Sequence, residues 1–177
     1  GSTSNLLAYS SAKSHSKYPE KFGTGIIDGV VATETANNAS VGGAMVPLLL
    51  LSYRYGPGIG ALAGFLYGLI NIIQDPFIVH PVQVLFDYPL PYMAMGLAGL
   101  WRGHLYRGTA LAFLARFLCH VISGVVFFAS YAPEGMNPLA YSLAFNATYL
   151  IPEFLICCLI LRLLPVKRLL AAMGQSR

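Results

Sequence analysis

Two long apolar runs constrain this chain more than any other feature of its sequence. Residues 108–131 (GTALAFLARFLCHVISGVVFFASY) and 138–164 (PLAYSLAFNATYLIPEFLICCLILRLL) are each long enough to cross a bilayer, which takes about 20 apolar residues in a helix. The runs 58–73 and 88–101 suffice with their flanking residues, and 44–53 is short. In chain order, the first to fifth predicted spans are 44–53, 58–73, 88–101, 108–131 and 138–164. Charged residues make up 10% of the chain, against roughly 25% in soluble domains. The sequence therefore predicts an all-α fold, a polytopic membrane helix bundle with four full spans and one short one.

Basic residues are concentrated in the segments that follow alternate predicted spans. The other connecting segments, 74–87 and 132–137, contain Asp75, Asp87 and Glu134 but neither lysine nor arginine. Because cytoplasmic loops are enriched in lysine and arginine, we expect a multi-pass protein of the plasma membrane with a cytoplasmic C-terminus. The basic residues concerned are Arg54, Arg102, Arg107, Lys167, Arg168 and Arg177.

The first 43 residues do not fit this topology. They contain Lys13, Lys17 and Lys21 and no convincing span, so the predicted orientation leaves three lysines outside, against the charge rule. This mismatch indicates that the native first helix is missing or replaced. We therefore divide the chain into an N-terminal segment, 1–43, and a membrane helix bundle, 44–177.

Glycines recur at four-residue spacing through the second predicted span. Gly56, Gly60, Gly64 and Gly68 share one helix face, where small residues allow helix backbones to approach closely. Packing within this chain is the favoured interpretation, and docking on another membrane subunit is the alternative.

Several polar residues lie where the bilayer makes them costly. Arg116, His120, Gly124 and Phe128 are spaced by four and line one face of the fourth span. Ionisable residues inside a membrane are expensive and usually functional. The other candidates are Asp87 and Tyr88 at the start of the third span, and Tyr141, Asn146 and Glu153 in the last.

Five of these residues together suit a site for an organic cation in the outer half of the bundle: Asp87, Tyr88, His120, Tyr141 and Asn146. A carboxylate at Asp87 and nearby aromatic rings attract a cation, while Asn146 and tyrosine hydroxyls suit the edge of a nitrogen heterocycle. Each member also has a structural interpretation. His120 could be a hydrogen-bonded packing residue, Arg116 could pair with Glu153, and the remaining residues could serve as interfacial aromatics or helix–helix contacts. The remaining residues are Tyr88, Phe128, Tyr141 and Asn146.

Other classes of function find little support. Cys119 and His120 are adjacent, so they point about 100° apart on a helix and cannot form a catalytic dyad with each other. The chain has no G-x-S-x-G, H-E-x-x-H or P-loop motif. It also lacks metal-ligand cysteine spacing and a run of basic residues interleaved with aromatics. We therefore expect neither an enzyme nor a nucleic-acid-binding protein, and no cofactor or metal.

From about residue 45 to 165 the chain resembles the thiamine-specific S-component of energy-coupling factor transporters. The resemblance rests on VPLLLLSYRYG, QDPFIVHPVQVLFDYPLPYMAMGLAGLWRG, RFLCHVISGVVFFASYAPEG and AYSLAFN. It implies a membrane protein that binds thiamine near the outer surface and docks on a transmembrane coupling subunit with two ATPase subunits. It also implies ligand contacts at Asp87, Tyr88, Arg116, His120, Gly124, Phe128, Tyr141 and Asn146.

Residues 1 to about 49 resemble a second family, the large membrane subunit of tripartite tricarboxylate transporters. The matching stretch contains ETANNASVGG at 34–43. The two resemblances meet at VPLLL, residues 46–50, which indicates a chimera. The alternatives to a thiamine-binding subunit are a fragment of a tricarboxylate transporter or a non-functional membrane chimera.

Overall fold

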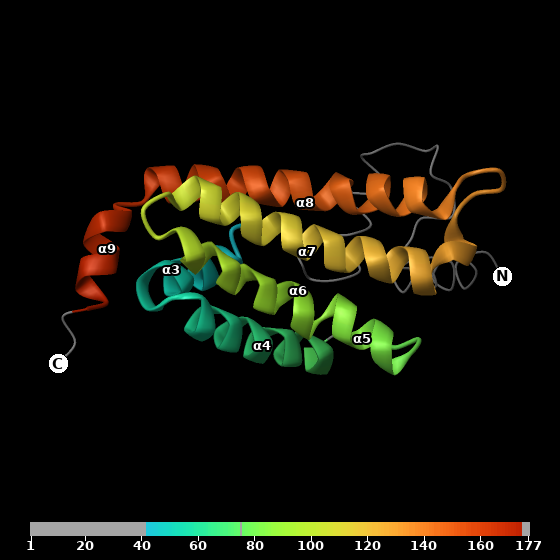
Figure 1. Ribbon diagram of the computed structural model, residues 1–177, viewed down its shortest axis with the longest axis horizontal. Helices are drawn as coiled ribbons and strands as arrows, with labels where there is room; N and C mark the ends of the chain where they lie inside the picture. Colours follow the sequence, from blue (N-terminus) through green and yellow to red (C-terminus); the bar gives the residue numbers. More distant parts are fainter. Residues whose placement is uncertain (1–41, 75, 175–177) are drawn as a thin grey trace, which may run out of the picture.

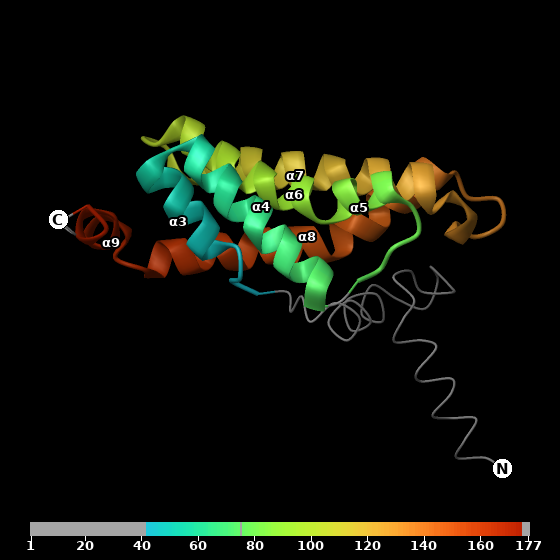
Figure 2. The same cartoon turned by 90° about the horizontal axis from the view of Figure 1, so that it is seen from below.

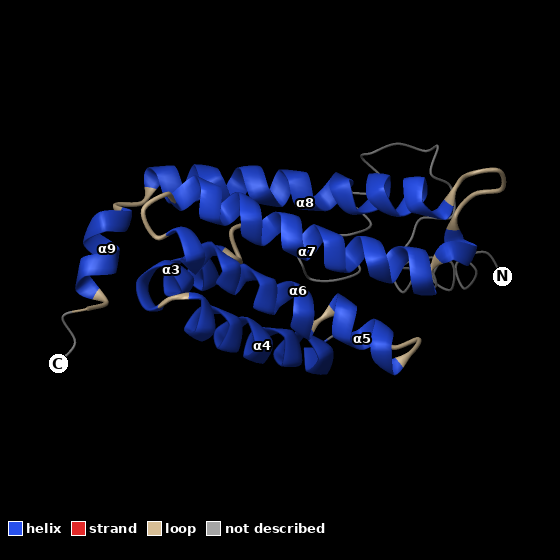
Figure 3. Cartoon of the chain, in the orientation of Figure 1, coloured by secondary structure: helices blue, strands red, loops and turns tan. Residues whose placement is uncertain are grey.

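The computed structural model describes residues 42–74 and 76–174, and all of their regular elements are helices (Figure 3). The all-α prediction is confirmed. Of the N-terminal segment, only residues 42 and 43 belong to the described part of the chain. The elements are α3 (Val46–Tyr55), α4 (Pro57–Gln74), α5 (Pro81–Asp87), α6 (Pro89–Met93), the 3₁₀ helix η1 (Ala94–Trp101), α7 (Leu105–Phe127), the 3₁₀ helix η2 (Ala129–Tyr131), α8 (Pro138–Leu163) and α9 (Val166–Ala172).

Three of these helices are long and apolar enough to cross a membrane. They are α4, α7 and α8, and they correspond to the predicted spans at 58–73, 108–131 and 138–164. α7 and α8 run side by side along the molecule, and α6 lies between α7 and α4 (Figure 1). The chain is therefore a multi-pass membrane protein, with α3 as the predicted short element.

The prediction of one helix over 88–101 was wrong. The structure divides this run into α6 and the 3₁₀ helix η1. Pro89 and Pro91 lack a backbone N–H, and Tyr88 is disfavoured from the α conformation because a proline follows it. A 3₁₀ helix rises about 2.0 Å per residue against 1.5 Å in an α-helix, so α6 and η1 together advance about 24 Å. The looser winding lets a short run cover most of the bilayer depth.

The glycines of α4 pack within the chain, in agreement with the favoured interpretation. Gly60, Gly64 and Gly68 are buried, and a Cβ at Gly64 would collide with the backbone of Tyr92. Gly56 does not belong to this face. It forms the turn between α3 and α4 with φ of 98°, a left-handed conformation that favours glycine.

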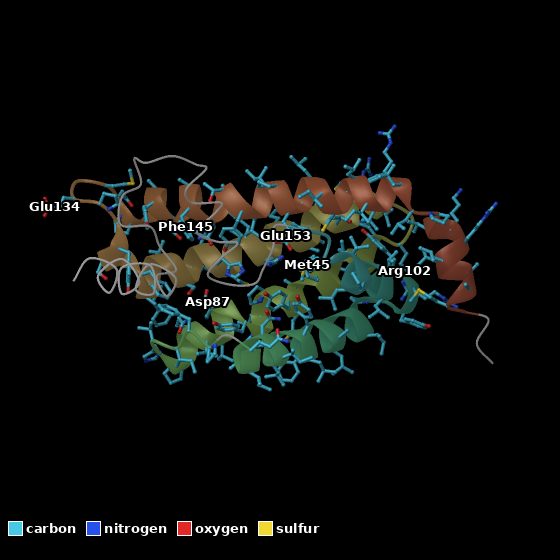
Figure 4. All side chains as sticks on the ribbon, turned by 180° about the vertical axis from the view of Figure 1, so that it is seen from behind. Met45, Asp87, Arg102, Glu134, Phe145 and Glu153 are labelled. Carbon is cyan, nitrogen blue, oxygen red and sulfur yellow. The ribbon has the colours of Figure 1, made fainter. Side chains whose placement is uncertain are left out.

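The two ends of the bundle differ in charge. Glu134 lies at one end and Arg102 at the other, with Asp87 and Glu153 between them (Figure 4). α9 lies across the Arg102 end, roughly perpendicular to α7 and α8 (Figures 1 and 2). We call this end, with Arg54, Arg102, Arg107, Arg162, Lys167 and Arg168, the basic end.

Burial follows the pattern expected of a protein surrounded by lipid. Large apolar side chains project outward, with Ile73 of α4 80% exposed and Leu163 of α8 74% exposed. Polar side chains lie inside, among them Asp87, Arg116 and Glu153. Because buried charge is costly unless it is paired, the inward polar residues define the region in which a site is to be sought.

Candidate ligand-binding site

Asp87 is the last residue of α5, and its side chain points into the bundle. It is 6% exposed. Its Oδ2 accepts a hydrogen bond from Nε2 of Gln83 at 2.5 Å, and its Oδ1 lies 3.5 Å from Nδ1 of His120 on α7. The structure therefore joins two of the predicted residues, Asp87 and His120, across two helices.

Gln83 also ties Asp87 to the segment that precedes α5. Its side chain is fully buried; Nε2 donates to the carbonyl of Phe77 at 3.1 Å and Oε1 accepts from the backbone N–H of Val79 at 3.0 Å. The backbone N–H of Phe77 in turn donates to the hydroxyl of Tyr88 at 2.9 Å. Segment 76–80 is thus held against the start of the third predicted span.

Phe77 brings two further predicted residues into the same region. Its ring stacks on Phe128 with centroids 5.9 Å apart and an interplanar angle of 27°, while its N–H bonds to Tyr88. Phe128 follows α7 directly and is 1% exposed. Tyr88 and Phe128 therefore both contact Phe77, which the sequence reasoning had not singled out.

Tyr149 links the histidine on α7 to the amide on α8. The rings of His120 and Tyr149 meet edge to face with centroids 6.1 Å apart. The Tyr149 hydroxyl donates to Oδ1 of Asn146 at 2.5 Å, and Nδ2 of Asn146 donates to the carbonyl of Ser142 at 2.8 Å. These two bonds fix the orientation of the Asn146 amide.

Tyr141 lies on the same helix and stacks on Phe145, with centroids 6.2 Å apart. Phe145 in turn packs against Tyr149 at 6.0 Å. Gly124 is buried one turn beyond His120, and its carbonyl accepts a hydrogen bond from the N–H of Phe128 at 3.1 Å. Aromatic contacts thus extend along α8 beside the Asp87–His120 pair.

Arg116 has a different partner from the other candidates. Its Nη1 lies 2.9 Å from Oε2 of Glu153, with both side chains almost fully buried, so the structure contains the internal pair that the sequence left open. The guanidinium also lies over the Tyr92 ring, 5.1 Å from its centroid. Arg116 is one turn from His120 toward the basic end.

Comparison with known proteins identifies the family. The sequence model of the family described as "Thiamine transporter protein" matches residues 24–172. The chain belongs to this family. The match to the family model begins at residue 24, so it includes residues 24–43 of the N-terminal segment.

Individual relatives agree with this assignment. The thiamine transporter ThiT of Bacillus subtilis is 38% identical over 142 residues, covering 71% of this chain and 74% of the relative. A solved structure of ThiT from Listeria monocytogenes has a TM-score of 0.64 at 21% identity and covers 70% of this chain and 76% of its own; it supports the fold. An uncharacterized 52.8 kDa protein of Agrobacterium vitis, named for the TAR-I ttuC′ 3′ region, is 33% identical over 107 residues, covering 55% of this chain and 21% of its own length.

Of the eight predicted site residues of this thiamine transporter family member, seven are buried and Tyr88 is half-buried. Direct contacts or one intervening ring connect Asp87, His120 and Asn146, and connect Tyr88 with Phe128. Gln83 and Tyr149 were missed. A signal existed for both, since Gln83 precedes Asp87 by four residues and Tyr149 follows Asn146 by three, the spacings that place side chains on one helix face.

The assembled groups suit an organic cation better than an anion. A buried carboxylate, several aromatic rings and an oriented amide offer Coulomb attraction, cation–π contact and hydrogen bonds to a heterocycle. In the part of the chain that the structure describes, no group of three or more His, Cys, Asp or Glu side chains could hold a metal ion.

Proposed function

We propose that this chain is the substrate-binding membrane subunit of a thiamine uptake system. Thiamine carries a permanent positive charge on its thiazolium ring and a hydrogen-bonding aminopyrimidine. Membership of the thiamine transporter family and the relatives named as thiamine transporters support this assignment. The mechanism is capture of the vitamin, with no chemical change made to it.

The observation that carries the proposal is the buried carboxylate of Asp87. Water is largely excluded from it, so its attraction to a cation is stronger than that of an exposed acid. His120 and Gln83 contact it directly, and both hold it in one orientation. The ligand contacts we propose are Asp87, Tyr88, Arg116, His120, Gly124, Phe128, Tyr141 and Asn146.

The charge distribution supports an orientation for this capture. The basic end carries six lysine and arginine residues, and cytoplasmic segments are enriched in such residues. We place the basic end and the C-terminus in the cytoplasm, with Asp87 toward the outside. Release into the cell then requires the partners that the family resemblance implies, a transmembrane coupling subunit and two ATPase subunits.

We also infer that the chain is a chimera whose segment 1–43 resembles a second protein family, with the thiamine transporter match reaching back to residue 24. The resemblance of residues 1 to about 49 to the tricarboxylate transporter subunit supports this. A fragment of a tricarboxylate transporter would bind a citrate-like anion. Asp87 disfavours that alternative because its carboxylate repels such a ligand.

Titration calorimetry on the detergent-purified full chain tests these proposals. We expect saturable thiamine binding and none with citrate. Asp87→Asn should weaken thiamine binding at least about tenfold, or 1.4 kcal/mol. Glu134→Gln is the matched control, since it makes the same acid-to-amide change at an exposed residue, and should leave the affinity unchanged. Equal affinities in both variants, or no binding by the folded protein, would contradict the proposal.

A further inference from the structure

We propose that a groove between α7 and α8 at the basic end binds an anionic phospholipid of the surrounding membrane. The groove is lined by Tyr106, Cys158, Leu159 and Arg162. Tyr106 lies in the first turn of α7 and Arg162 in the last turn of α8. On the orientation proposed above, the groove opens to the cytoplasmic leaflet, where anionic lipids are concentrated.

The charge around the groove has one sign. The carboxylates among the described residues are Asp87, Glu134 and Glu153, and none of them lies at the basic end (Figure 4). Glu153 is paired with Arg116 in the interior. Arg162 is exposed and has no carboxylate partner among residues 42–74 and 76–174. A ligand with a negative headgroup complements this surface.

The residues that line the groove suit an amphiphile. Leu159 is 54% exposed and, with Cys158, forms an apolar wall one helical turn from Arg162, on the side away from the basic end. An acyl chain can lie against that wall while the phosphate contacts the Arg162 guanidinium, whose fork of N–H donors matches phosphate oxygens. Tyr106 lines the groove from α7 and carries a hydroxyl, a further donor. The four lining residues thus match the apolar and polar parts of one lipid.

Aromatic residues place this groove at the level of the lipid headgroups. Trp101, Tyr106 and Tyr55 are between 45% and 49% exposed, and all three lie at the basic end. Exposed tryptophan and tyrosine are enriched at the boundary between hydrocarbon and water. The arginine of the groove is therefore at the depth where a phosphate group lies.

α9 extends the same charged surface. It lies across the bundle axis (Figures 1 and 2), so it runs along the membrane surface when α7 and α8 cross it. The Tyr55 hydroxyl donates to the Met173 carbonyl at 2.8 Å and anchors the end of α9 to α3. Leu170 packs on the core while Lys167 and Arg168 are exposed. Lys167 and Arg168 follow Arg162 closely in the chain, and their charges strengthen the positive potential beside the groove.

Native mass spectrometry of the full chain in a neutral detergent tests the proposal. The protein is titrated with phosphatidylglycerol and with phosphatidylcholine that carry identical acyl chains. We expect phosphatidylglycerol to bind at least about fivefold more tightly, since the Arg162 guanidinium is proposed to contact the negatively charged headgroup directly through charge-assisted hydrogen bonds, which are stronger than neutral ones. Arg162→Gln should remove most of this preference. Arg107→Gln removes an exposed arginine at the same end that does not line the groove, and should leave the preference within about twofold.

Two further arms distinguish a lipid site from a diffuse charge effect and from a site for phosphate alone. Leu159→Trp fills the groove and keeps every charge, so it should weaken the binding of both lipids. Thermal unfolding shows whether this variant is folded. If it is not, the result for Arg162→Gln decides whether the groove binds lipid. Glycerol phosphate at millimolar concentration should not displace phosphatidylglycerol. Equal losses in Arg162→Gln and Arg107→Gln would show a diffuse charge effect and overturn the proposal, as would displacement by glycerol phosphate.

The proposal uses the orientation given with the proposed function, and thiamine titrations of the same variants separate lipid binding from thiamine binding. The groove residues of α8 lie about 18 to 24 Å along the helix from Asn146, at 1.5 Å per residue. We expect the thiamine affinity of Arg162→Gln to equal that of the unaltered chain. The lipid titration contains no thiamine, so the failure of either experiment leaves the other interpretable.

Discussion

Gln83 and Asp87 lie one turn apart on α5, with the amide nitrogen of Gln83 2.5 Å from Oδ2 of Asp87. Gln83 is fully buried and also bonds to Phe77 and Val79. Its amide therefore both orients the carboxylate and attaches it to segment 76–80. We regard Gln83 as a positioning residue for the proposed thiamine site.

Gln83→Met should weaken thiamine binding about tenfold in calorimetry. The change keeps an unbranched side chain but removes a hydrogen bond to a charged group, worth about 1.5–3 kcal/mol. Leu85→Ala on the same helix, at a side chain 51% exposed, is the control and should have little effect. In the double variant Gln83→Met/Asp87→Asn, the two losses should be clearly less than additive, since both act on one interaction. Full additivity would show that Gln83 acts elsewhere.

Tyr149→Phe should weaken thiamine binding about fivefold. It removes the hydroxyl that donates to Asn146 Oδ1 at 2.5 Å, a bond worth about 1 kcal/mol. Tyr55→Phe makes the same change at the basic end, where the hydroxyl bonds to Met173, and should leave the affinity unaltered. An unchanged thiamine affinity in Tyr149→Phe would show that the bond from Tyr149 to Asn146 does not contribute to binding.

Glu153→Leu should lower the stability of the protein by about 3–5 kcal/mol, because it leaves the buried Arg116 guanidinium without its carboxylate. The double variant Arg116→Met/Glu153→Leu should recover most of this loss in thermal unfolding. Its thiamine affinity then reports on the Arg116–Glu153 pair without the cost of an unpaired buried charge. Binding at full strength by the double variant would make Arg116 a structural residue and not a ligand contact.

Gly64→Ala should destabilise the protein by about 1–3 kcal/mol, the usual cost of overpacking. A Cβ at this position meets the backbone of Tyr92, whereas a Cβ at Gly58 meets nothing within 4 Å. Gly58→Ala on the same helix should therefore be neutral or stabilising, because alanine has the higher helix propensity. Thermal unfolding of the two variants side by side measures the difference, and equal effects would contradict close packing of α4 on α6.

The sequence predicted which of the candidate residues are buried, because helical spacing is visible in it. The four-residue spacing of Arg116, His120 and Gly124 correctly indicated one face of α7, and all three are buried there. The cost of burying ionisable groups in a membrane identified Asp87 as well. Gln83 was overlooked because an amide is not ionisable, so the same criterion does not detect it.

The sequence by itself determined the class of the protein, an all-α membrane bundle with spans at α4, α7 and α8, because the length and apolar character of a run are local properties. Only the tertiary structure decided that Arg116 pairs with Glu153, that Asp87 meets His120, and that residues 94–101 form a 3₁₀ helix. Periodicity specifies which face of a helix is buried. It does not specify which side chain of another helix lies opposite, because that depends on how the helices pack in three dimensions.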